Sequence, residues 1–170
     1  PQAREHVAPA FMLDAAGALV GTAWALVFLA ILAWAAYVDA QRRIIPNASV
    51  AALAVWGLVG HALRCLGMAL PFLPSLSTCV ITSAVLFCAC LVFEAVWRAA
   101  HKGSSGMGMG DIKLMGAAGL ALGAWVLPCL VAACLSAVLI ETLRHNRAFA
   151  FGPYLCACFA VCLIYLVVSN

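Results

Sequence analysis

Long stretches without Asp, Glu, Lys or Arg limit what this chain can fold into. They cover residues 15–38, 44–63, 65–93, 114–140 and 148–170. Each is about as long as the roughly 20 apolar residues with which an α-helix crosses a bilayer, or longer. Hydrophobic residues make up 67% of the chain and charged residues only 9%, so a soluble domain is excluded. The sequence predicts an all-α, polytopic membrane protein.

The fourth stretch allows two interpretations. As one helix, residues 114–140 would reach about 40 Å, more than the roughly 30 Å of a hydrocarbon core. Gly119, Gly123 and Pro128 also interrupt it, so the alternative is a hairpin of two short spans turning between Gly123 and Pro128. In the third stretch, Pro71 and Pro74 predict that the helix begins near Ser75 and ends near Trp97.

The distribution of Lys and Arg favours six transmembrane helices with the N-terminus outside, because basic residues are enriched in cytoplasmic loops. In that topology only Arg4 and Arg64 lie outside. The inner loops then carry Arg42, Arg43, Arg98, Lys102, Lys113, Arg144 and Arg147. With five spans this bias nearly disappears. We therefore expect an extracytoplasmic tail at residues 1–14, one six-helix membrane domain at 15–170, and cytoplasmic loops at 39–47, 98–113 and 144–152.

The few acidic residues can be weighed one by one. Glu94 lies four residues before Arg98, and Glu141 three before Arg144. This is the spacing of ion pairs on one helix face, and the alternative for each glutamate is contact with a basic substrate. Asp39 and Asp111 have no such explanation.

Asp39 closes the first apolar stretch and Asp111 opens the fourth, so the preferred topology brings both to the cytoplasmic membrane boundary. They form either two interfacial ion pairs, with Arg42, Arg43 or Lys113 as partners, or a shared site. Two carboxyls a few ångströms apart cannot both ionise easily, so such a pair holds one proton. The ionised member can then deprotonate water while the protonated member polarises a carbonyl, which is amide hydrolysis without a metal.

Other chemistries find little support in the sequence. There is no H-E-x-x-H zinc motif and no P-loop, and the four histidines are dispersed. Ser104 and Ser105 lack a placed base. The scattered basic residues give no nucleic-acid signal. We expect no cofactor, no metal and no nucleic-acid partner, only the lipid bilayer and a polypeptide substrate.

The glycines near Asp111 divide into two groups. Gly106, Gly108 and Gly110 precede it and predict a pliable loop whose backbone can approach a bound peptide. Gly116, Gly119 and Gly123 follow it and are better interpreted as helix-packing positions.

Three motifs together resemble the type IV prepilin peptidase family. V-D-A-Q-R-R-I-I-P-N at residues 38–47 is similar to its first active-site motif, and G-M-G-D-I-K-L at 108–114 is similar to its G-x-G-D-x-K-L signature. F-G-P-Y-L at 151–155 resembles the element before its last helix. The resemblance covers roughly residues 20 to 168.

This resemblance implies an aspartic endopeptidase that removes the basic leader of prepilins or pseudopilins at the cytoplasmic face of the inner membrane. It implies Asp39 and Asp111 as the catalytic pair. Gly108, Gly110, Lys113, Pro46 and Asn47 would shape the site. From the placement of charges, and not from the resemblance, we also expect the leader's cationic side chains to lie near Glu94 or Glu141. The substrate's hydrophobic helix would lie alongside in lipid.

The chain departs from larger family members, which carry an additional N-terminal segment with paired C-x-x-C and also methylate the new terminus. Methyltransferase activity is therefore not expected. The short form is more similar to the peptidases of tight-adherence (Flp-type) pilus systems, and archaeal preflagellin peptidases are similar as well. The alternative is a non-catalytic membrane component of a secretion or pilus system, or a transporter, in which the two aspartates serve as ion pairs or proton carriers.

Overall fold

The computed structural model describes residues 7–68, 70–101, 106–144 and 150–169, and all side chains within them except those of residues 7–16 and 144. This part of the chain is helical and contains no strand, so the predicted all-α class is confirmed. Its helices are α1 (Val7–Arg42), α2 (Asn47–Cys65), α3 (Leu76–Ala100), α4 (Met109–Leu122), α5 (Val126–Arg144) and α6 (Gly152–Ser169). A short 3-10 turn, η1 (Gly123–Trp125), joins α4 to α5.

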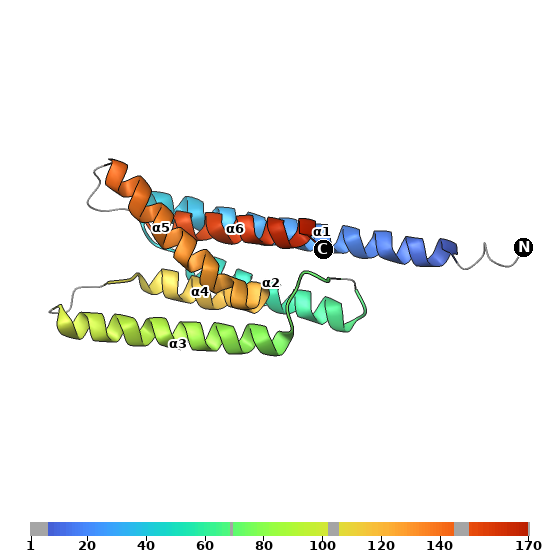
Figure 1. Ribbon diagram of the computed structural model, residues 1–170, viewed down its shortest axis with the longest axis horizontal. Coiled ribbons are helices and arrows are strands. Elements are labelled where there is room, and N and C mark those ends of the chain that lie inside the picture. Colours follow the sequence, from blue (N-terminus) through green and yellow to red (C-terminus); the bar gives the residue numbers. More distant parts are fainter. Residues whose placement is uncertain (1–6, 69, 102–105, 145–149, 170) are drawn as a thin grey trace, which may run out of the picture.

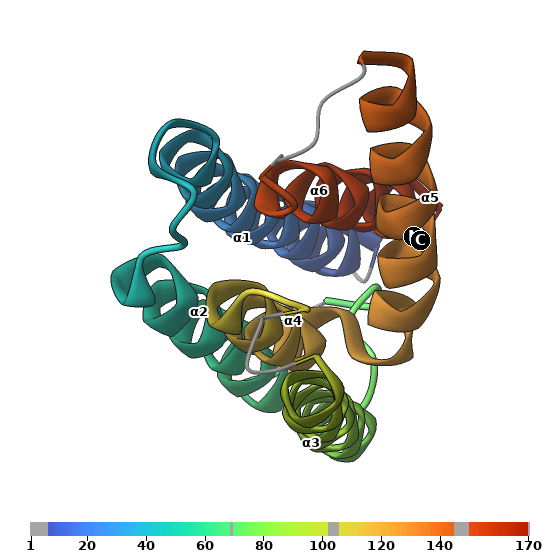
Figure 2. The same ribbon diagram turned by 90° about the vertical axis from the view of Figure 1, so that its left-hand side faces the viewer.

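The helices form two rows (Figures 1 and 2). Looking along the bundle, Figure 2 shows α1 beside α6 in one row and α2, α4 and α3 in the other. Helix α5 packs on α6 and connects the two rows. The end of α1, the start of α2, the end of α3, the start of α4, the end of α5 and the start of α6 all lie at the left-hand end of Figure 1. The three loops predicted to share one face therefore begin and end together.

In the described part of the chain, five helical segments are long and apolar enough to cross a membrane, and they follow the predicted apolar stretches. They are Gly17–Arg42, Asn47–Cys65, Leu76–Ala100, Met109–Leu143 and Gly152–Ser169. The protein is therefore an integral membrane protein. The fourth of these segments contains α4, η1 and α5, so the five segments do not establish six separate spans. They do not establish on which side the N-terminus lies either. Six spans and an outside N-terminus both stay predictions. Helix α1 begins at Val7, before the predicted start of the first span, and the tail assignment for residues 1–14 is untested.

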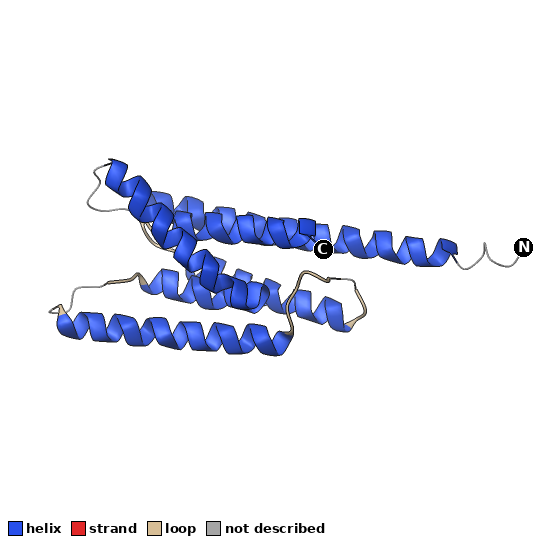
Figure 3. Cartoon of the chain, in the orientation of Figure 1, coloured by secondary structure: helices blue, strands red, loops and turns tan. Residues whose placement is uncertain are grey.

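The chain turns back inside the fourth segment, within the predicted interval. Helix α4 runs away from the left-hand end of Figure 1 and α5 returns toward it; Figure 3 shows the same in one colour for all helices. Gly123 makes this possible because its φ is +54°, in the left-handed region that side chains disfavour. A Cβ here would also lie 3.1 Å from Pro74, which precedes α3. Gly123 therefore ends α4 as well as packing closely.

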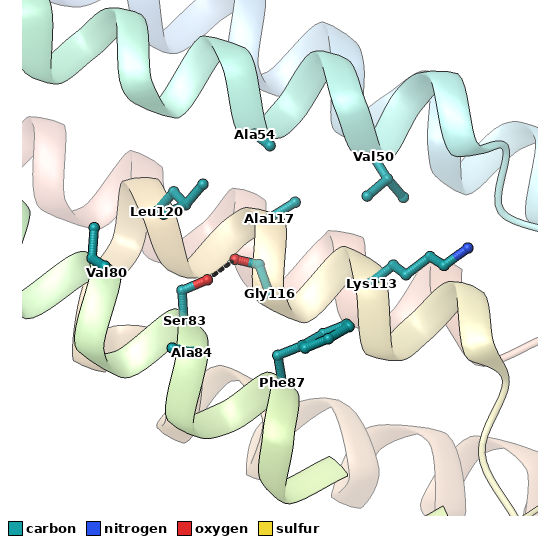
Figure 4. Close-up of a pocket in the computed structure, with 10 residues that line it drawn as sticks. All are labelled: Val50, Ala54, Val80, Ser83, Ala84, Phe87, Lys113, Gly116, Ala117 and Leu120. Atoms are coloured by element: carbon teal, nitrogen blue, oxygen red, sulfur yellow. Dashed lines mark hydrogen bonds between the residues drawn. The ribbon is translucent and has the colours of Figure 1, made fainter. Parts of the chain in front are cut away.

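Helix α4 is the centre of the second row and the most buried helix of the bundle. Nine of its fourteen residues are buried, and it packs mainly on α2 and α3. Figure 4 shows how small residues permit this: Ser83 of α3 donates a hydrogen bond to the carbonyl of Gly116, and Ala117 lies beside it. A Cβ on Gly119 would lie 3.0 Å from the Ser83 backbone, which confirms the packing role predicted for Gly116 and Gly119.

Helix ends follow local sequence signals. Ser75 caps α3 by accepting a hydrogen bond of 3.3 Å from the Thr78 backbone N–H, close to the start predicted from the prolines. Pro46 precedes α2 in an extended conformation and its carbonyl accepts from the Ser49 hydroxyl at 2.8 Å. Pro46 thus ends the loop that carries the first motif.

Candidate active site

Asp39 lies in the last turn of α1, with 5% of its surface exposed. The helix continues to Arg42, one turn beyond the residue expected to close the span. Arg43 then adopts a φ of +54° and its N–H donates to the carbonyl of Asp39 at 2.7 Å. This left-handed cap reverses the chain, and residues 44–47 consequently return across the end of the bundle.

The Asp39 carboxylate contacts the first residue of α6. The backbone N–H of Gly152 donates a hydrogen bond of 3.1 Å to Oδ2 of Asp39. A Cβ on Gly152 would lie 2.5 Å from the same oxygen, so only glycine permits this approach. The F-G-P-Y-L motif therefore supplies a donor to the aspartate of the first motif.

Asp111 lies in the first turn of α4, where the unpaired N–H groups and the dipole of the helix favour a negative charge. Gly108 is the N-cap of the helix, in an extended conformation. A Cβ on Gly108 would lie 2.8 Å from Oδ2 of Asp111, and one on Gly110 would lie 3.0 Å from Ile45. The two glycines of the G-x-G-D motif thus leave room for the carboxylate and for the returning loop.

The two aspartates line one cavity of about 330 Å³ at this end of the bundle. The remaining walls come from the two motif loops: Arg43, Ile44, Ile45, Asn47, Gly108, Met109, Gly110 and Lys113. The structure therefore brings together every predicted site residue except Pro46, which instead lies at the N-cap of α2. An ionised and a protonated carboxyl in such a cavity can act as base and acid on one bound amide.

Lys113 links the second motif to the first. Its Nζ donates a hydrogen bond of 3.0 Å to Oδ1 of Asn47, across the cavity from α4 to α2. Within the described residues Lys113 forms no ion pair with Asp111. The structure therefore does not show the alternative, an ion pair between Lys113 and Asp111.

Glu94 has a role that sequence reasoning missed. Its predicted pair with Arg98 is confirmed, since Arg98 Nε lies 2.5 Å from Oε1. Its other oxygen, Oε2, accepts hydrogen bonds from the backbone N–H groups of Gly106 (3.0 Å) and Met107 (2.8 Å). A spacing of four residues predicts the first contact, but backbone donors carry no sequence signal for the others.

Glu141 contacts a residue that the sequence did not indicate. Its Oε1 accepts a hydrogen bond of 2.5 Å from the hydroxyl of Tyr154 on α6, and its predicted partner Arg144 lies outside the described side chains. Glu94 and Glu141 are only 3% and 8% exposed, so neither presents a carboxylate to a leader at the surface. This burial counts against the expectation that the leader's cations lie near them.

Some predicted features lie outside the described residues, namely Ser104, Ser105 and Lys102 in the glycine loop and Arg147. In the part of the chain that is described, no three His, Cys, Asp or Glu side chains gather as metal ligands would. Among the described residues, His61 is a buried histidine, and its Nε2 contacts the carbonyl of Leu120 at 2.8 Å.

Comparison with known families matches the chain to the type IV leader peptidase family over residues 26–168. Comparison with curated proteins and with solved structures gives no significant match. The family match includes both aspartates and all three motifs, and it covers most of the chain. The function of the protein is accordingly that of a membrane protease of the leader-peptidase type. The chain belongs to the type IV leader peptidase family.

Proposed function

We propose that the protein is an aspartic endopeptidase that removes the basic leader of prepilins or pseudopilins at the cytoplasmic face of the inner membrane, with Asp39 and Asp111 as its catalytic pair. The observation that carries this proposal is their common cavity. The end of α1 and the start of α4 supply one carboxyl each, and both line the same space of about 330 Å³.

The reaction needs one proton shared by two carboxyls. The ionised aspartate removes a proton from water, and the resulting hydroxide attacks the scissile carbonyl carbon. The protonated aspartate meanwhile donates to the carbonyl oxygen. The tetrahedral intermediate then collapses as a proton passes to the leaving nitrogen, so the amide bond breaks and a carboxylic acid and an amine form. The Gly152 N–H keeps one oxygen of Asp39 fixed during these steps.

The position of the cavity suits a substrate that is partly in the membrane. Both carboxyls lie at an end of helices that are otherwise apolar enough to span a bilayer. A peptide bond between a charged leader and an apolar helix would meet the aspartates at that depth. The leader would then stay in water while the following helix stays in lipid.

The test is co-expression with a candidate prepilin whose mass is followed. We expect Asp39→Asn and Asp111→Asn each to abolish removal of the leader while the protein still inserts in the membrane. Asp14→Asn is the matched control, since Asp14 lies near the start of α1, at the opposite end of the bundle. This variant should remove the leader at the normal rate.

Normal processing by both site variants would refute the catalytic assignment. Failure of the unmutated protein to process any prepilin would instead favour a non-catalytic role for the pair. A variant that does not reach the membrane is replaced by Asp→Glu at the same position, because this keeps the carboxylate but moves it by about 1.5 Å. That shift should still cost about 100-fold in rate.

A further inference from the structure

We infer that Glu94 is a positioning residue, which holds the loop before α4 in place and thereby fixes Asp111 in the cavity. This inference rests on the proposed catalytic role of Asp111. It begins from the location of Glu94, in the last two turns of α3, with its carboxylate buried against the segment that enters α4.

The Glu94 carboxylate binds main-chain groups as well as the Arg98 side chain. Oε2 accepts from two consecutive N–H groups, those of Gly106 and Met107, while Oε1 faces Arg98 Nε. Charge-assisted hydrogen bonds of this kind are about twice as strong as neutral ones. Because one oxygen accepts from two consecutive N–H groups, it also fixes the orientation of the peptide unit between them.

Gly106 also lies against a second side chain of α3, that of Trp97. A Cβ on Gly106 would lie 2.7 Å from the indole ring of Trp97, which also belongs to α3. The backbone at this point therefore lies directly on α3, and only a glycine can approach so closely. Glu94 and Trp97 together attach the loop to the end of α3.

The attached segment leads directly into the candidate site. Met107 is followed by Gly108, whose Cα faces the Asp111 carboxylate, and by the first turn of α4. Only a few residues with fixed geometry separate the bound amides from Asp111. A shift of about 1 Å at the amides would therefore reach the carboxylate, and misplacement of that size can cost about 100-fold in rate.

Glu94→Gln tests the inference because an amide has one acceptor oxygen where the carboxylate has two. Either the Arg98 contact or the loop contacts must then face an NH₂ donor. We expect kcat on a prepilin to fall about 10- to 100-fold, with KM within about threefold of the unmutated value. Hydrogen exchange should accelerate in peptides that contain Gly106 and Met107 and stay unchanged in α1 and α6.

Arg98→Gln is the matched control. It removes the half-exposed cation but keeps the carboxylate of Glu94, whose Oε2 accepts from Gly106 and Met107. We expect its kcat to stay within about threefold of the unmutated protein, as is usual for partly exposed ion pairs. Equal losses in the two variants would mean that Glu94 serves only the ion pair, which would overturn the inference.

Two further outcomes separate this inference from its alternatives. A rise in KM at constant kcat for Glu94→Gln would indicate contact with the leader and refute positioning. If Glu94→Gln does not accumulate, Gly106→Ala replaces it: its added methyl pushes the loop from Trp97 with Glu94 intact, and it should lower kcat similarly.

A different result is expected if the proposed peptidase function is wrong. Asp111→Asn would then cleave as well as the unmutated protein, while hydrogen exchange of Glu94→Gln would still report whether the carboxylate holds the loop. Unchanged exchange at Gly106 and Met107 in that variant would overturn the inference, whatever the peptidase assay shows.

Discussion

The N–H of Gly152 donates to the carboxylate of Asp39 at 3.1 Å, although the two residues are 113 positions apart in the chain. This contact joins the last turn of α1 to the first residue of α6. It directs a backbone donor, from the positive end of a helix dipole, at a buried carboxylate. The last helix of the bundle is therefore part of the candidate site and not only part of the membrane anchor.

Gly152→Ala should remove most of the activity without unfolding the protein. The new Cβ would lie 2.5 Å from Oδ2 of Asp39 and 3.2 Å from the Ile45 side chain, so the carboxylate must move. We expect kcat on a prepilin to fall about 100-fold, the effect of a displacement near 1 Å. The initial rate of leader removal in membranes, normalised to protein amount, measures it.

Gly57→Ala is the control for that variant. Gly57 lies in the middle of α2, where a Cβ would meet Leu120 at 3.3 Å, and it lines no part of the cavity. Its activity should stay within about threefold of the unmutated value, because small helix-packing changes away from a site have little effect on chemistry. Equal losses in the two variants would indicate a general effect of glycine replacement on the bundle.

Gly108→Ala should impair the second half of the site. Its Cβ would lie 2.8 Å from Oδ2 of Asp111, while its backbone conformation (φ −65°, ψ 133°) suits any residue. Strain in the main chain is therefore not expected, and the effect comes from the carboxylate alone. We expect kcat to fall about 10- to 100-fold with an unchanged thermal unfolding midpoint. A lower midpoint with normal activity would contradict this reasoning.

Much of the fold could be predicted from the sequence because membrane spans are encoded in composition. The apolar stretches matched the helices, and the turn near Gly123 lay in the predicted interval. Positions of Lys and Arg grouped the three loops at one end, and that grouping placed Asp39 and Asp111 together. Charge alone did not fix where α1 ends, since its helix continues past Asp39 to Arg42.

The details of the site could not be predicted because they are contacts of the main chain. The N–H groups bound by Asp39 and Glu94 belong to Gly152, Gly106 and Met107. Every residue except proline carries such a donor, so no residue pattern marks which one is used. Spacing did predict the contact of Glu94 with Arg98, which lies within one helix.

His61→Phe should lower stability with little effect on catalysis. The ring is 4% exposed, and its Nε2 contacts the Leu120 carbonyl near the end of α4 at 2.8 Å. Phenylalanine fills the space but leaves that carbonyl without its partner, at a cost of about 1–3 kcal/mol. Thermal unfolding in detergent measures this. His101→Phe is the control, because His101 is exposed and stacks on Trp97 with centroids 3.9 Å apart; an equal decrease there would refute the explanation.

Tyr154→Phe should loosen the attachment of α6 to α5 and so affect Asp39 indirectly. The hydroxyl donates to Oε1 of Glu141, and Oε2 of that buried carboxylate has no hydrogen-bond partner among the described residues. Removal of the hydroxyl takes away the hydrogen bond to Oε1 of this buried carboxylate, which should cost about 1–3 kcal/mol of stability. Because Tyr154 is two residues from Gly152, we also expect kcat to fall about three- to tenfold.

Tyr165→Phe, on the same helix but 61% exposed, should change neither quantity. If Tyr154→Phe unfolds at the same temperature and cleaves at the same rate as Tyr165→Phe, the hydroxyl does not hold α6 against α5, and the position of Gly152 must depend on the packing of α6 against α1.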